Sequence, residues 1–172
     1  DNTTTGSTIN ARFVNNGLIE ANAGDLNIAG SSPKDNNTLI RARNGGNLRF
    51  ANITVENAGA TIEAGAGSTV SYENVSIIGG ALSGAGTHIV SSNDATLVGT
   101  TTPVTIAADS TVELIGSSSH FVRLEGSIVN NGEIVLQDTG GGTNQIHIAN
   151  AVNMTGSGTI RLAGVEDNTI IP

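Results

Sequence analysis

Residues 18–28 read LIEANAGDLNI, residues 39–50 read LIRARNGGNLRF and residues 61–72 read TIEAGAGSTVSY. The three segments repeat one pattern, because Ile19, Ile40 and Ile62 recur at almost the same interval. A constant interval is typical of a stacked repeat protein with one structural unit per interval. Apolar and polar residues alternate in each half of the unit, and a glycine-containing corner separates the halves, so the pattern predicts two short strands joined by a turn.

A unit of this size cannot bury its apolar side alone, so we expect each coil to lie on the coil before it. An Asn-containing corner recurs once per coil, as VNNG at 14–17 and IVNNG at 128–132. This spacing favours a coil corner over a β-hairpin, which would place the corner between two self-complementary strands. We therefore expect an all-β, parallel β-helix (β-solenoid) formed by residues 1–172 as a single domain, with roughly eight coils of about 20–22 residues.

The composition limits the core and the partners. The chain contains three Phe, one Tyr and no Trp, so the core must consist mainly of Ile, Val, Leu and Ala, and its 23 Gly with abundant Thr, Ser and Asn disfavour helices. A net charge of -8 gives no basic surface for nucleic acid or anionic membranes. No apolar run is long enough to insert into a membrane. The absence of Cys excludes disulfides and thiolate metal sites.

The ends of the chain predict its partners. The sequence begins at Asp1 without an initiator Met or a signal segment, so we expect a processed subunit or a fragment of a longer surface protein. Neither end shows an amphipathic helix or a polar cap, and an uncapped solenoid exposes unpaired strand edges. We therefore expect it to associate with itself through its open ends, or with neighbouring coils of a longer chain.

Three segments resemble a known family: VNNGLIEANAGDLNI at 14–28, GATIEAGAGSTVSY at 59–72 and IVNNGEIVL at 128–136. They are similar to the coils of right-handed parallel β-helix passengers in filamentous-haemagglutinin-like exoproteins and autotransporter adhesins. The resemblance is one of composition and period and covers most of the chain. It implies a right-handed helix, secretion to the cell surface, an elongated rod and a role in adhesion or as a stalk, with host or cell-surface glycans as candidate partners.

Stacking predicts one charged ladder and two exposed loops. Glu20, Arg41 and Glu63 occupy equivalent places on three consecutive coils, which indicates a structural ion-pair ladder on the sheet surface. Two polar segments, 29–37 and 138–144, are expected to protrude and to offer contacts. The residues expected to make these contacts are Pro33, Lys34, Asp35, Asp138 and Asn144.

Catalysis is the main alternative, because polysaccharide-cleaving enzymes share this fold. Glycoside hydrolysis needs two convergent carboxylates, and the nearest candidates are Asp109 with Glu113 and the adjacent Glu166 and Asp167. Adjacent strand residues point to opposite faces, and Asp109 is expected at a corner, so neither pair is expected to converge. We therefore expect no enzyme activity, and a groove near the two loops would be the sign of a carbohydrate-active enzyme.

Metal binding and ice binding are weaker alternatives. His88, His120 and His147 fall on different segments, and His88 and His147 are expected to point outward, so no metal or cofactor site is predicted. An ice-binding face would need a regular Thr-x-Thr ladder, whereas Thr61, Thr69 and Thr111 do not recur on every coil. The sequence thus favours a non-enzymatic extracellular structural or adhesive β-helix, either an adhesin stalk or a subunit that assembles end to end into a fibre.

Overall fold

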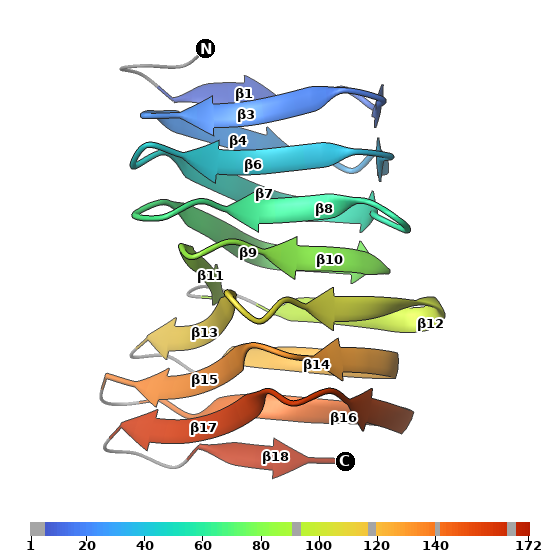
Figure 1. Ribbon diagram of the computed structural model, residues 1–172, viewed down its shortest axis with the longest axis vertical. Helices are drawn as coiled ribbons and strands as arrows, with labels where there is room; N and C mark the ends of the chain where they lie inside the picture. The colour runs from blue at the N-terminus through green and yellow to red at the C-terminus, as the bar shows by residue number, and fades with distance from the viewer. Residues whose placement is uncertain (1–5, 91–93, 117–119, 140–141, 165–167) are drawn as a thin grey trace.

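The computed structural model describes residues 6–90, 94–116, 120–139, 142–164 and 168–172. These residues form 18 β-strands and no helix, and every pairing between the strands is parallel. The strands stack as a β-solenoid of about seven turns, with β1 and β18 at opposite ends of the stack (Figure 1). The predicted fold class is therefore confirmed, and the parallel pairing excludes the hairpin alternative for the Asn-containing corners.

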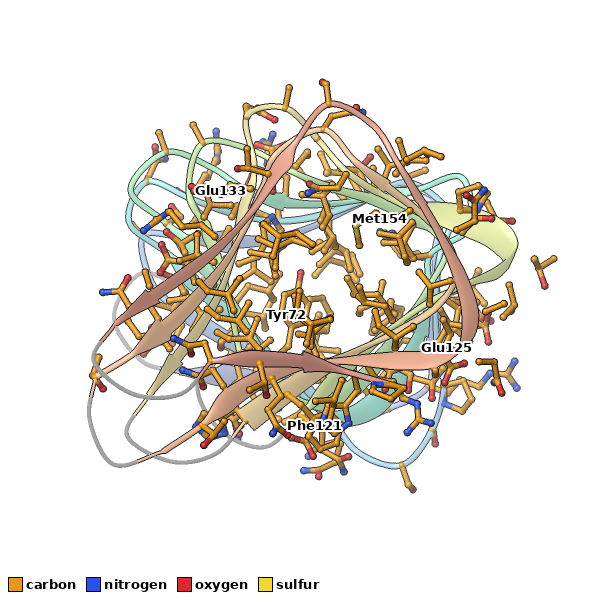
Figure 2. The ribbon with its side chains drawn as sticks, turned by 90° about the horizontal axis from the view of Figure 1, so that it is seen from below. Tyr72, Phe121, Glu125, Glu133 and Met154 are labelled. Carbon is orange, nitrogen blue, oxygen red and sulfur yellow. The ribbon has the colours of Figure 1, made fainter. Side chains whose placement is uncertain are left out.

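The strands form three faces, which Figure 2 shows end-on as the three sides of the solenoid. The β3 face contains β3 (Leu18–Asn22), β6 (Leu39–Arg43), β8 (Thr61–Ala64), β10 (Gly80–Ser83) and the C-terminal parts of β12 (Ala95–Ile106), β14 (His120–Asn130) and β16 (Asn144–Thr155).

The β4 face contains β1 (Ser7–Ile9), β4 (Asp25–Ala29), the N-terminal parts of β7 (Asn47–Glu56) and β9 (Thr69–Ile78), β11 (Thr87–Val90), β13 (Thr111–Gly116), β15 (Glu133–Asp138) and β17 (Thr159–Gly164). The β5 face contains β2 (Phe13–Asn15), β5 (Lys34–Asn36), the C-terminal parts of β7 and β9, the N-terminal parts of β12, β14 and β16, and β18 (Thr169–Ile171).

The coils have unequal lengths. Leu26 pairs with Leu48 and Leu48 with Val70, so the first coils repeat at the constant interval that the sequence predicts. Further along, Ala95 pairs with Val122, which is a longer step along the sequence. The structure has about seven turns where the sequence predicts roughly eight. Longer steps such as this one are offset by shorter ones such as that from Thr69 to Thr87, so the mean interval stays near the early one.

Apolar columns fill the interior. Ile40, Ile62 and Leu82 stack in register on the β3 face and are all buried. In each column a branched side chain packs on its equivalent in the next coil. This packing fills the interior without the large aromatic residues that many other cores contain. The predicted core of small aliphatic residues is therefore the one observed.

A buried asparagine ladder runs beside these columns. The Nδ2 atom of Asn15 donates to Asn36 Oδ1 over 2.8 Å, and Asn36 Nδ2 donates to Asn57 Oδ1 over 2.7 Å. All three side chains lie in the corner that leads from the β5 face to the β3 face, and all three are buried. Asn15 therefore holds neighbouring coils together, whereas the sequence pattern predicted only that it turns the chain.

Other asparagines do turn the chain. Asn52 and Asn74 adopt positive φ angles of 55° and 53°, and each bends its strand from the β4 face onto the β5 face. Asn and Gly tolerate this left-handed conformation better than other residues. The two side chains also hydrogen bond to each other over 3.1 Å at the solvent-exposed corner.

Candidate functional site

The predicted ion-pair column lies on the outside of the β3 face. Glu20 pairs in register with Arg41, and Arg41 with Glu63. The Nε atoms of Arg41 and Arg43 lie 2.6 and 2.8 Å from Glu20 Oε2. Burial disfavours the charged carboxylate, but the hydrogen bonds from the two arginines outweigh it and lower the pKa of Glu20. Among the described residues no ion pair joins Arg41 to Glu63, so the cluster consists of Glu20, Arg41 and Arg43 instead of the predicted three.

The 29–37 segment differs from the predicted exposed loop. Pro33 is exposed, but Lys34 is fully buried, with 0% of its surface accessible. Lys34 pairs in register with Phe13, and its Nζ donates to Ser32 O over 2.9 Å. Its predicted exposure is therefore wrong: residues 34 and 36 repeat the inward positions of residues 13 and 15, and a Lys there must point inside. Asp35 points outward, and its Oδ2 lies 3.5 Å from Nη2 of Arg12.

The 138–144 segment also differs from the prediction. Asn144 begins β16 and is fully buried, because it lies two residues before the inward-facing Ile146. Among the described residues, neither amide atom of Asn144 has a hydrogen-bond partner, and neither does Nδ1 of its register neighbour His120. The predicted role of Asn144 as an exposed contact is therefore wrong. Asp138 ends β15, and its side chain lies outside the described part of the chain.

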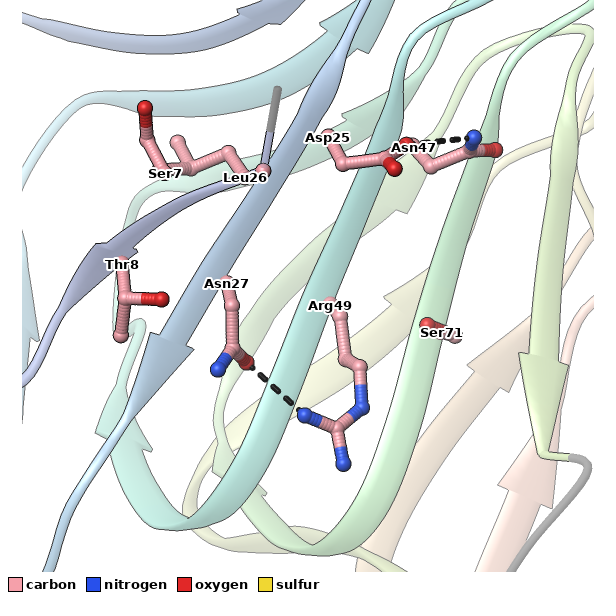
Figure 3. Close-up of a pocket in the computed structure, with 9 residues that line it drawn as sticks. Ser7, Thr8, Asp25, Leu26, Asn27, Asn47, Arg49 and Ser71 are labelled. Carbon is pink, nitrogen blue, oxygen red and sulfur yellow. Dashed lines mark hydrogen bonds between the residues drawn. The ribbon is translucent and has the colours of Figure 1, made fainter.

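A hollow of about 370 Å³, lined by Ser7, Thr8, Leu26 and Arg49 among others, lies on the outside of the β4 face (Figure 3). Arg49 lines this hollow, and its guanidinium donates to Asn27 Oδ1 over 3.1 Å and, through Nε, to Glu73 Oε1 over 2.7 Å. At the rim, Asn47 donates to Asp25 over 2.8 Å. Because Glu73 and Asn27 occupy the guanidinium, Arg49 is better placed to bind neighbouring coils together than to bind an anion.

The candidate carboxylates do not meet at one point. Asp109 lies in the turn before β13, where it lines a hollow of about 390 Å³ with Glu133. Glu113 lies on the outside of β13, in register with Ile89 and Val135, and does not line that hollow. Glu133 is paired with Arg161 over 2.8 Å. The other candidate pair falls at 166–167, outside the described residues.

The histidines occupy three different environments. His88 is buried, which contradicts the expected outward orientation, because it shares the inward side of β11 with Val90. Its Nδ1 lies 2.7 Å from the hydroxyl of Tyr72 and its Nε2 lies 3.0 Å from Ser83 O. Burial lowers the pKa of His88 to about 4. His147 does point outward, and its ring stacks on Phe121.

The threonines form one incomplete column. Thr69, Thr87 and Thr111 lie in register on the outside of three successive coils, and Glu133 follows them in the fourth. The neighbouring column holds Ser71, Ile89 and Glu113 at the same three levels. The sequence pattern missed this run because the interval between Thr69 and Thr87 is short. A regular Thr-x-Thr array does not form on this face of the described chain.

The comparisons with known proteins add nothing to the fold class. In the described residues no group of three or more His, Asp or Glu side chains is placed to hold a metal ion, and no helix is long and apolar enough to cross a membrane. Neither a scan against protein-family models nor searches of curated proteins and solved structures found a match. The chain is thus defined by its class, a parallel β-solenoid with polar outer ladders.

Proposed function

We propose that this protein is a non-enzymatic extracellular rod, whose coils serve as the stalk of a surface adhesin or stack end to end as fibre subunits. Parallel strand ladders run along the solenoid on all three faces, so each coil presents the same backbone edges to the next. Such a surface favours the addition of further strands. The acidic, cysteine-free composition and the adhesin-like coils support an extracellular setting.

The observation that carries this proposal is the last coil. Leu162 pairs in register with Leu136, and Ile170 with Ile146. Leu136 and Ile146 are fully buried, whereas Leu162 and Ile170 are 49% and 47% exposed. Their inward positions would be covered by one more coil stacked on the same axis. A second copy of this chain, or further coils of a longer one, would supply that coil.

Electron microscopy of negatively stained protein across a range of concentrations tests this assembly. We expect filaments of uniform width that lengthen with concentration. The Leu162→Lys substitution places a charge on the exposed surface of the last coil. Because a second copy could not stack on that charge, we expect this variant to form no filaments. Ile89→Lys is the matched control, because Ile89 lies mid-rod on the outside of the β4 face. Its filaments should resemble those of the wild type.

Two results would separate the forms of the proposal. Short monodisperse rods at every concentration would overturn self-assembly and favour a stalk, in which coils of a longer chain cover Leu162 and Ile170. Filaments that survive Leu162→Lys would show that the end surface is not the contact. Circular dichroism of both variants would establish that the solenoid itself is intact.

A further inference from the structure

Asparagine is followed directly by glycine at three corners of the solenoid, at residues 16–17, 44–45 and 131–132. In such a pair the glycine amide nitrogen can attack Cγ of the asparagine side chain, because glycine has no Cβ to hinder the approach. The attack forms a C–N bond and closes a succinimide ring, and the side-chain nitrogen leaves with the amide proton as ammonia. One water molecule then opens the ring to aspartate or isoaspartate, so the conversion needs no enzyme, cofactor or oxidant.

The corner at Asn16 and Gly17 holds both reacting groups in place. The Gly17 amide donates to Asn15 Oδ1 over 3.2 Å. The side-chain oxygen of Asn16 accepts from Asn37 Nδ2 over 2.8 Å. Before the ring can close, the amide must leave its acceptor and the side chain must leave its neighbour. Both hydrogen bonds therefore slow the conversion.

The corner at Asn44 and Gly45 is held in the same way. The Gly45 amide donates to Ser68 Oγ over 3.1 Å. Asn44 Nδ2 donates to Asn22 Oδ1 over 2.8 Å. Asn16 and Asn44 are both exposed to solvent, so exposure alone would make them the reactive asparagines. Their hydrogen bonds predict the opposite.

The corner at Asn131 and Gly132 lacks the restraint on the glycine. Among the described residues the Gly132 amide has no hydrogen-bond acceptor. Asn130 Oδ1 lies two residues before the glycine, as the acceptor does in the first corner, but it has no partner in that part of the chain. Asn131 Oδ1 accepts from Ser157 N over 3.4 Å, which is longer than the side-chain bonds of the other two corners. The pair also lines the hollow of about 390 Å³, which gives water access to the ring.

We infer that Asn131 is a self-modification site, at which the folded chain forms aspartate or isoaspartate faster than at its other two Asn-Gly pairs. Either product adds a carboxylate to the hollow that Asp109 and Glu133 already line. Isoaspartate also lengthens the backbone by one CH₂ group. The Asn131 amide donates to Ile106 O over 2.9 Å, so this product strains the contact between two coils. The corner thus becomes more acidic with time, whether or not the rod assembles.

Peptide mapping by tandem mass spectrometry tests the inference on the folded protein, incubated at mildly alkaline pH and sampled over time. Heavy-oxygen water labels the product, because hydrolysis of the ring incorporates one oxygen from the solvent. We expect the peptide with Asn131 to be converted at least about fivefold faster than those with Asn16 and Asn44, since one hydrogen bond fewer must break. Equal or slower conversion at Asn131 overturns the inference.

Unfolding provides the matched control for the fold. All three asparagines precede a glycine, so in concentrated urea the three peptides should be converted at similar rates. A preference for Asn131 that persists in urea would show that the local sequence decides, and it would overturn the role of the corner. The Asn131→Gln variant should lose the modification in its peptide, because the longer side chain disfavours ring closure.

A substitution at the second corner tests the hydrogen-bond argument directly. Ser68→Ala removes the acceptor of the Gly45 amide and leaves the Asn131 corner untouched. We expect conversion at Asn44 to rise about fivefold in the folded variant, toward the rate at Asn131. An unchanged rate at Asn44, with circular dichroism showing an intact solenoid, would refute the argument that a free glycine amide selects the site.

Discussion

The buried asparagine ladder yields the sharpest prediction about stability. Replacing Asn36 by Ala removes its hydrogen bonds to Asn57 Oδ1 and Thr61 O, and those it accepts from Asn15 Nδ2 and the Thr38 amide. A hydrogen bond contributes about 1 kcal/mol net, and a buried partner left unsatisfied costs about 1–3 kcal/mol. We therefore expect Asn36→Ala to lower the free energy of unfolding by roughly 3–5 kcal/mol.

The adjacent residue provides a matched control. Asn37 Nδ2 donates to Asn16 Oδ1 over 2.8 Å, so the same side chain makes the same kind of cross-coil bond, but at an exposed position. Water replaces that bond when it is lost, and we expect Asn37→Ala to cost less than about 1 kcal/mol. Equilibrium unfolding in urea, followed by circular dichroism, measures both changes. Equal losses for the two variants would refute the argument that burial gives the ladder its strength.

Three further predictions concern single buried or strained positions. The pKa of His88 is about 4 in the folded protein, whereas its ordinary value is 6.5. Between pH 6.5 and pH 4, therefore, the His88 imidazole is protonated in the unfolded chain but not in the folded protein. Stability should therefore fall by roughly 3 kcal/mol from pH 6.5 to 4, and His88→Gln should lose that part of the pH dependence in urea titrations. Gly80 and Gly59 both have positive φ, but a Cβ on Gly80 would lie 2.0 Å from Asn57 O, whereas one on Gly59 meets nothing within 4 Å. Thermal unfolding should show a loss of about 1–2 kcal/mol for Gly59→Ala and more than about 3 kcal/mol for Gly80→Ala; similar losses would exclude the clash. Burial lowers the pKa of Lys34 by disfavouring its charge, so Lys34→Met should raise the free energy of unfolding by about 1 kcal/mol, and a lower value would show that the Ser32 contact matters more.

The fold could be predicted where the interval between coils is constant. The columns of Ile19 and Leu26 continue in the structure at the spacing that the sequence shows. After Val75 the register depends on the length of each corner, which alternation of apolar and polar residues does not reveal. The step from Thr69 to Thr87 is shorter than the early repeat, and the step from Ala95 to Val122 is longer. The short and long steps offset each other, so the predicted count of roughly eight coils lies close to the about seven turns of the structure.

The inward polar residues could have been found from the alternation of inward and outward positions along each strand. Asn15, Asn36 and Asn57 recur at one constant interval, the same interval that separates Ile19 from Ile40, and this is the signal of a stacked ladder. The same alternation places Lys34 inside, because it lies two positions before the inward Asn36. Composition argued the opposite, because lysine is usually exposed. The position within the coil decided the outcome, since a strand residue cannot turn outward without moving its neighbours to the wrong face.

The outward columns follow a different rule, and this explains why the candidate site could not be predicted. An inward residue must pack on its equivalents above and below, so a change there affects three coils. An outward residue has water as an alternative partner, and its column can vary from coil to coil at little cost in stability. The column from Thr69 through Thr111 to Glu133 varies in this way. Phe121 and His147 likewise meet only because their two coils stack, and they do not recur at a fixed interval. A binding site built on this rod is therefore expected in the outward residues that break the repeat.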